Sequence, residues 1–180
     1  MKKLLTVLMF VLTAMAAMAA MAAKFEKPIM LTSVGQSADV QMVKALLKKG
    51  GLESGFDKSI TAEGLTNEKT LILAIGGSSK GLGAAGIKVE DELDRTAKLI
   101  KGARDKGIKI IGMHIGGAAR RGELSDKFVN AAAPNVDYLI IVEEGNKDGL
   151  FTKMSTEKNI PMDTVPKITN AVDPLKKAFE

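Results

Sequence analysis

The stretch from Thr70 to Lys88, TLILAIGGSSKGLGAAGIK, constrains the fold most strongly, because an apolar run ends abruptly in a glycine-rich segment. The apolar part, Leu71 to Ile75, is typical of a buried strand. Five glycines fall between Gly76 and Gly86, and the acidic run Glu90-Asp91-Glu92 then indicates a helix start. A strand, a glycine loop and a helix in this order form many ligand sites in α/β proteins.

The remaining chain repeats this alternation of apolar strands and amphipathic helices. The expected strands are 28–34, 56–60, 71–75, 108–115, 137–142 and 162–165, of which 56–60 is the least secure and belongs at a sheet edge. The expected helices begin after Ser37 or Asp39, at Glu90, at a cap formed by Ser125, at Leu150 and at Ile168. Strands without polar alternation, separated by helices, predict a parallel sheet covered on both faces. We therefore expect a three-layer doubly wound α/β domain, Rossmann-like or flavodoxin-like, with five to six mainly parallel strands.

Residues 1–23 have the pattern of a secretory signal peptide. Met1-Lys2-Lys3 is basic, Leu4 to Leu12 is apolar except for Thr6, and alanines and methionines follow to Ala23. We expect cleavage near Ala23, a single domain over 24–180, and a periplasmic or extracellular location without a stable membrane anchor. The alternative is an uncleaved anchor, since residues 4–23 are just long enough to span a bilayer.

Composition excludes several classes of function. The chain has 26 basic and 21 acidic residues, and two of the basic ones lie in the expected signal peptide, so the remaining positive charge is mild. No basic run with interleaved aromatic residues appears, so we expect no nucleic-acid partner. With no cysteine, disulfides and thiolate metal ligands are excluded.

The glycine-rich segment has three alternative explanations. It is a tight connection that needs glycine for its own conformation, or a nest of backbone N–H groups for an anion, or a dinucleotide loop, because Gly81 to Gly86 match G-x-G-x-x-G. GGSSKGLG resembles the cofactor loop of short-chain dehydrogenases, but that resemblance ends within about a dozen residues. The catalytic Tyr-x-x-x-Lys of that family is missing, since Val142 stands four residues after Tyr138, the only tyrosine. We therefore reject the dehydrogenase interpretation, and the cofactor stays unknown.

The exit loops of parallel strands gather at the carboxyl edge of the sheet, where ligands bind. In a flavodoxin-like strand order, the loops after the first and third strands would flank the favoured crevice. We expect a small anionic or polar ligand there, bound by residues of four loops. The candidates are Ser33, Gln36, Ser37, Gly76, Gly77, Ser78, Ser79, Lys80, Gly81, Gly83, His114, Gly116, Gly117, Arg120, Arg121, Glu144 and Asn146.

Several of these residues also have simpler explanations. His114, the only histidine, is a weak catalytic candidate because a histidine near the end of an apolar strand is more often a hydrogen-bonded core residue. Arg120 and Arg121 are candidates for a carboxylate or phosphate clamp, or else pair with Glu143 and Glu144. A metal site built from Glu143, Glu144, Asp148 and His114 lacks recognisable spacing, and we predict none.

The segments GGSSKGLGAAG, MHIGGAARRGELSDKF and VEEGNKDGLFTK resemble a family of exported bacterial proteins classed as a domain of unknown function. The resemblance covers nearly all of 24–180. It implies a small α/β domain outside the cytoplasm, with no established activity and no assigned catalytic residues.

Three hypotheses follow for the function, and whether the chain is an enzyme is left open. The first is a ligand-binding domain that uses Lys80, Arg120 and Arg121. The second is a hydrolase or transferase acting on an anionic substrate, with His114 as its best candidate. The third is a protein-interaction module, which predicts an exposed apolar patch.

Overall fold

The computed structural model describes residues 24–180, so the predicted signal peptide lies outside the described residues. Within these residues six strands form one sheet, and every neighbouring pair is parallel. The strand order is β2-β1-β3-β4-β5-β6. The strands are β1 Ile29–Val34, β2 Gly55–Phe56, β3 Thr70–Ile75, β4 Lys109–His114, β5 Tyr138–Val142 and β6 Met162–Val165.

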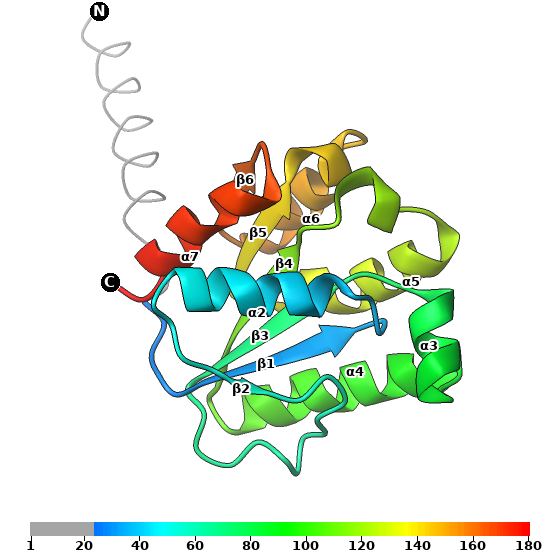
Figure 1. Cartoon of the computed structure of the whole chain (residues 1–180), viewed down its shortest axis with the longest axis horizontal. Coiled ribbons are helices and arrows are strands. Elements are labelled where there is room, and N and C mark those ends of the chain that lie inside the picture. The colour runs from blue at the N-terminus through cyan, green and yellow to red at the C-terminus, as the bar shows by residue number, and fades with distance from the viewer. Residues whose placement is uncertain (1–23) are drawn as a thin grey trace, which may run out of the picture.

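Helices cover both faces of this sheet (Figure 1). The α-helices are α2 Asp39–Lys49, α3 Ser79–Ala85, α4 Val89–Asp105, α5 Glu123–Ala132, α6 Leu150–Lys158 and α7 Val172–Lys177. In the part of the chain that the structure describes, four short 3₁₀ turns accompany them: η1 Gly117–Arg120, η2 Ala133–Asn135, η3 Glu143–Asn146 and η4 Ile168–Ala171. The predicted three-layer doubly wound fold is confirmed, and the short strand β2 lies at the sheet edge as expected.

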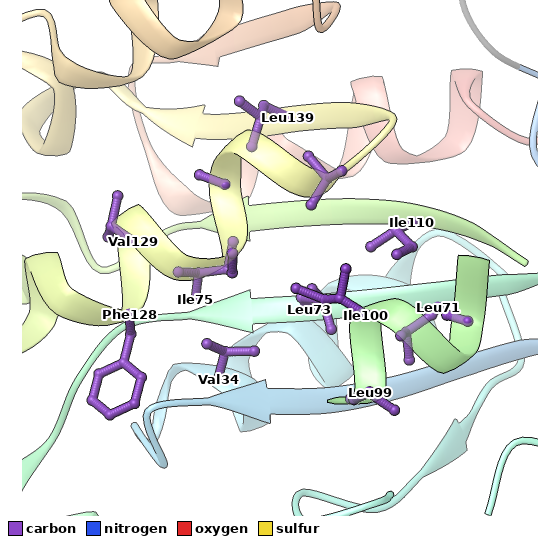
Figure 2. Packing of buried hydrophobic residues seen from close by; sticks show 14 of the residues in the cluster. Val34, Leu71, Leu73, Ile75, Leu99, Ile100, Ile110, Phe128, Val129 and Leu139 are labelled. Atoms are coloured by element: carbon purple, nitrogen blue, oxygen red, sulfur yellow. The ribbon is translucent and has the colours of Figure 1, made fainter. Parts of the chain in front are cut away.

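The strand side chains alternate between two cores, because successive residues of a strand point to opposite faces. Leu71, Leu73 and Ile75 of β3 pack with α4, α5 and α6 on one face. Ile72 and Ala74 pack with α2 and α7 on the other. Figure 2 shows the first core, where Leu99 and Ile100 of α4 and Phe128 and Val129 of α5 lie over the strands. This is why the central strands read as continuous apolar runs.

Three local predictions are wrong. The glycine-rich segment is not a loop, because Ser79–Ala85 forms helix α3. The second strand is Gly55–Phe56 and does not extend to Ile60. Ser125 does not cap α5 but lies inside it, two residues after the helix start.

Candidate functional site

Strand β1 ends in a turn of unusual backbone conformation. Gly35 has a φ of 90° and Gln36 a φ of 57°, in a region that residues other than glycine seldom occupy. Glu92 of α4, which is fully buried, accepts hydrogen bonds from the Gly35 N–H at 3.0 Å and from the Gln36 side-chain amide at 3.1 Å. The buried carboxylate therefore holds this turn in place.

The Glu92 carboxylate is neutralised by Arg95, one turn further along α4. Arg95 Nε lies 2.8 Å from Glu92 Oε2, and its other nitrogens donate to the carbonyl oxygens of Ser33 and Ile60. These bonds tie α4 to the end of β1 and to the connection that precedes β3. Sequence reasoning missed both residues, because a Glu and an Arg three positions apart on a helix look like an ordinary surface pair.

The predicted crevice between the first and third loops is closed. The Gly76 N–H donates to Val34 O and the Ser78 N–H to Gly35 O, each at 2.9 Å, and Gln36 forms an isolated bridge with Gly77. These backbone bonds join the two loops directly across the point where the strand order reverses. The expectation of an open site there was wrong, because the pairing joins residues about 40 positions apart and has no local signature.

An open depression lies beside this point, between the first turn of α3 and the loop that leads from η1 into α5. Its volume is about 530 Å³. Figure 1 shows α3 and α5 together at the end of the molecule towards which the β1 arrow points. The lining residues are Gly77, Ser78, Ser79, Lys80, Ala119, Arg120, Arg121, Gly122, Glu123, Leu124 and Ser125. The structure thus brings Gly77 to Lys80 together with Arg120 and Arg121, as the sequence predicts.

Helix α3 begins at this depression. Ser78 precedes the helix in an extended conformation, and its hydroxyl accepts a hydrogen bond from the Gly81 N–H. Lys80 is exposed, and within residues 24–180 it takes part in no ion pair. Its ammonium group is therefore available to a ligand.

Arg121 is fully engaged within the protein. It pairs with Asp126 at 2.8 Å and Asp148 at 2.7 Å, and it donates to Gly145 O. These carboxylates raise the pKa of Arg121 further, and the guanidinium holds the pKa of Asp148 well below its usual range. This network joins the start of α5 to the start of α6.

Arg120 pairs with Asp39 at the start of α2, at 3.1 Å. The expected pairing of Arg120 and Arg121 with Glu143 and Glu144 is therefore wrong. Glu144 pairs instead with Lys147 at 2.6 Å.

His114 is sealed inside the protein. The residue has no exposed surface, and its ring packs against Phe151 with a centroid separation of 4.9 Å. Its Nδ1 lies 3.0 Å from Ile75 O, and its Nε2 lies 3.4 Å from Gly117 O. Burial lowers the pKa of His114, and the two carbonyl contacts oppose that shift only partly. His114 cannot reach a substrate in the depression, which removes the best candidate for a catalytic base.

Most other candidates have structural roles. Ser33, Gln36 and Ser37 are buried at the end of β1, and the Ser37 hydroxyl accepts a hydrogen bond from the Asp39 N–H. The side-chain oxygens Ser33 Oγ and Gln36 Oε1 have no partner among residues 24–180.

The remaining candidates are four glycines and Asn146, which follows strand β5. Gly76 and Gly116 lie beneath the Arg120–Asp39 pair, and Gly117 has a φ of 59°. Gly83 lies on the exposed side of α3. The Asn146 side-chain oxygen accepts a hydrogen bond from the Phe151 N–H, in the first turn of α6, at 2.9 Å.

A second, smaller depression of about 320 Å³ adjoins the first. It is lined by Ala118, Arg121, Gly122, Asp126, Glu144, Lys147 and Asp148. Within residues 24–180, no group of three or more His, Asp or Glu side chains is arranged to hold a metal ion. Over the same residues, none of the helices combines the length and the apolar character needed to cross a membrane.

A family model described as a domain of unknown function (DUF6305) matches residues 26–179. The chain belongs to this family. The match confirms the resemblance to a family of unknown function and names no activity. No curated protein matches the chain.

Solved structures with a loosely similar arrangement include two hydrolases. One is the esterase EstA from Pseudoalteromonas sp., with 12% identity, a TM-score of 0.35, and coverage of 83% of this chain and 94% of the esterase. Another is a GDSL-like lipase from Bacteroides thetaiotaomicron, with 12% identity, a TM-score of 0.37, and coverage of 91% of this chain and 93% of the lipase. Neither likeness bears on what this chain does.

Proposed function

We propose that this domain binds a small anionic or polar ligand in the larger depression. The observation that carries the proposal is the convergence of Lys80 and Arg120, which lie far apart in the sequence, on one open hollow at the carboxyl edge of the sheet. Ser79 adds an exposed hydroxyl beside them. Ligands of doubly wound domains bind at this edge.

The electrostatics of the depression favour directed hydrogen bonds over a strong general attraction. Glu123 lines the same hollow and carries the opposite charge, and Arg121 is already neutralised by two carboxylates. The first backbone amides of α5 have no partner inside the helix and supply further donors at Glu123 and Leu124. We therefore expect a ligand selected by its acceptor oxygens and not by charge alone.

The two other hypotheses lack a supporting observation. The hydrolase or transferase hypothesis relied on His114 as its base, and His114 is buried away from the depression. An interaction module would need an apolar patch, and Met42 is the one large apolar side chain of residues 24–180 that is strongly exposed, at 45%.

Calorimetric titration with a panel of inorganic phosphate, citrate and nucleotides, at constant ionic strength, tests the proposal. We expect Lys80→Ala to weaken binding roughly tenfold, the value of a charge-assisted hydrogen bond. Its unfolding free energy should stay within about 0.5 kcal/mol of wild type, since Lys80 is exposed. Lys49→Ala, in the last turn of α2, removes the same charge away from the depression and should bind as wild type does. The proposal fails if no panel member binds, or if Lys80→Ala binds as tightly as wild type.

We also propose that the domain works outside the cytoplasm, after removal of a signal peptide that ends near Ala23. The support is the basic start, apolar middle and alanine-rich end of residues 1–23. N-terminal sequencing of protein recovered from cell fractions of a bacterial host tests this. We expect a chain that begins near Lys24 in the periplasm or medium. A chain that keeps Met1 and remains in the cytosolic fraction would contradict it.

A further inference from the structure

We propose that Arg120 is the residue that grips the ligand, through its two terminal nitrogens, and that Asp39 is its positioning residue. This inference rests on the proposed function and narrows the ligand to oxyanions with two adjacent acceptor oxygens. Three features of the structure support it: the unused donors of Arg120, the fixed position of its side chain, and the contrast with Arg121.

The donors of Arg120 are only partly used within the protein. Its Nε donates to both carboxylate oxygens of Asp39, at 3.2 and 3.1 Å. Among residues 24–180, neither of its terminal nitrogens, Nη1 and Nη2, has a hydrogen-bond partner, and neither is among the buried unpaired atoms. The Arg120 side chain is 29% exposed and lines the depression. Its outer edge therefore offers N–H donors to solvent.

The neighbouring arginine provides the contrast. In Arg121, Nε and both terminal nitrogens donate to Asp126, Asp148 and the Gly145 carbonyl. Its side chain is only 14% exposed. The two adjacent arginines therefore differ in their hydrogen bonding. Arg121 links α5 to the loop before α6, whereas the terminal N–H groups of Arg120 have no partner among residues 24–180.

Arg120 is held at both ends. On the main-chain side, the Ser125 hydroxyl donates to Arg120 O and accepts from the Gly77 N–H at 2.9 Å. On the side-chain side, Asp39 holds Nε. The stem passes over Gly116, where a Cβ atom would overlap both Arg120 and Asp39. A side chain fixed in this way loses little conformational entropy when a ligand binds.

This geometry selects the chemical class of the ligand. The edge formed by Nη1 and Nη2 presents two parallel N–H donors, which suit the paired oxygens of a carboxylate or a phosphate. A single-atom anion such as chloride offers no second acceptor. We infer that Arg120 binds a carboxylate or phosphate group at the depression, with Lys80 supplying a further charge.

Titration calorimetry with inorganic phosphate and with citrate, at ionic strength held constant with sodium chloride, tests the inference. The variants are Arg120→Lys, Asp39→Asn and Asp39→Ala, with Arg104→Lys as the control, since Arg104 pairs with Asp137 next to β5, outside the depression. Lysine keeps the charge but loses the paired donors, so Arg120→Lys should weaken both ligands roughly tenfold. Arg104→Lys should bind as wild type does.

Asp39 is tested by the difference between its two variants. Asparagine keeps one acceptor oxygen for Nε, so Asp39→Asn should retain most of the affinity that Asp39→Ala loses. Urea unfolding of each variant separates lost positioning from lost folding, because affinity is compared only at conditions where the protein is fully folded. Tighter binding by both Asp39 variants would show that Asp39 competes with the ligand and would overturn its positioning role.

Binding by wild type, Lys80→Ala and Arg120→Lys distinguishes an incorrect role for Arg120 from an incorrect binding site. Suppose that wild type binds phosphate or citrate and that Lys80→Ala weakens this binding, but that Arg120→Lys binds as wild type does. The depression is then the binding site, and Arg120 does not bind the ligand. In a competition titration, chloride should displace bound phosphate far less effectively than citrate does. If both displace phosphate at the same concentration, the inferred selection for ligands with paired oxygens is wrong. If no ligand binds wild type at all, both proposals fall.

Discussion

Gly81 and Gly83 lie two positions apart in helix α3 and meet opposite surroundings. A Cβ atom on Gly81 would overlap the carbonyl oxygen of Gln36, far inside van der Waals contact. A Cβ atom on Gly83 would have no atom within 4 Å, and the Gly83 backbone is helical. Within the G-x-G-x-x-G pattern, Gly81 is therefore required because α3 packs closely against the β1 turn. This packing explains the glycine without a bound dinucleotide.

We predict opposite effects for alanine at these two positions. Gly81→Ala forces α3 away from Gln36 and should lower the free energy of unfolding by about 1–3 kcal/mol. Gly83→Ala should raise it by about 0.5–1 kcal/mol, because alanine loses less backbone entropy in a helix. Urea unfolding of both variants measures this difference. Equal destabilisation by the two substitutions would contradict the packing described for Gly81.

His114 should make stability depend on pH. Burial lowers the pKa of His114 in the folded protein, whereas in the unfolded chain the pKa is about 6.5. The unfolded state therefore binds a proton that the folded state resists, and stability falls as the pH drops below about 6.5. We expect His114→Gln to lose stability overall but to show a shallower decline between about pH 7 and pH 5.5. Parallel pH profiles of wild type and variant, measured by urea unfolding, would show that His114 does not titrate as proposed.

Among the elements, helix α4 does most to fix the end of β1. Its Glu92 and Arg95 form a pair whose side chains are 0% and 12% exposed, and the same pair bonds to the β1 turn and to Ile60 O. The attraction within a buried ion pair is largely offset by the cost of removing both charges from water. Removing one partner is nevertheless strongly destabilising, because the other charge is left buried without a partner. The helix thus acts as a clamp on the left-handed turn at Gln36.

We predict that Glu92→Gln lowers the free energy of unfolding by about 3 kcal/mol, because Arg95 then loses its carboxylate partner in a largely buried position. The control is Asp94→Asn, which removes an exposed carboxylate that pairs with Lys98 on the same helix. That change should cost less than about 1 kcal/mol. Similar losses for the two variants in thermal or urea unfolding would show that the clamp adds nothing to an ordinary surface pair.

The sequence predicted helices and strands whose boundaries are marked by neighbouring residues. It did not predict features that depend on residues far away along the chain. Strand β6 and helix α6 fall at their expected positions, because turn residues bound them: Pro161 and Pro166 flank β6, and Gly149 and Asn159 flank α6. Helix α3 was missed, because SKGLGAA has low helix propensity and forms only with the Ser78 cap and the burial of Leu82. The partners Asp39 for Arg120 and Asp148 for Arg121 lie far along the chain, and no spacing rule indicates them.

At the scale of the whole molecule, the six-stranded parallel sheet places four exit loops at one edge and then closes most of that edge with its own contacts. Backbone bonds join the β1 and β3 loops, and the Arg120–Asp39 pair lies above Gly76 and Gly116. What remains open is the hollow between α3 and the start of α5. The edge was predictable from the topology, but the open part of it was not, because side-chain pairing decides which loops stay accessible.

The central claim is that this hollow is the binding site, and an amide NMR titration of the wild-type domain with inorganic phosphate tests it most directly. We predict saturable shifts of amides in residues 77–80 and 119–125, which line the hollow, with little change near Glu144 or Lys147 in the second depression. Shifts confined to the second depression, or to residues remote from both, would contradict the account.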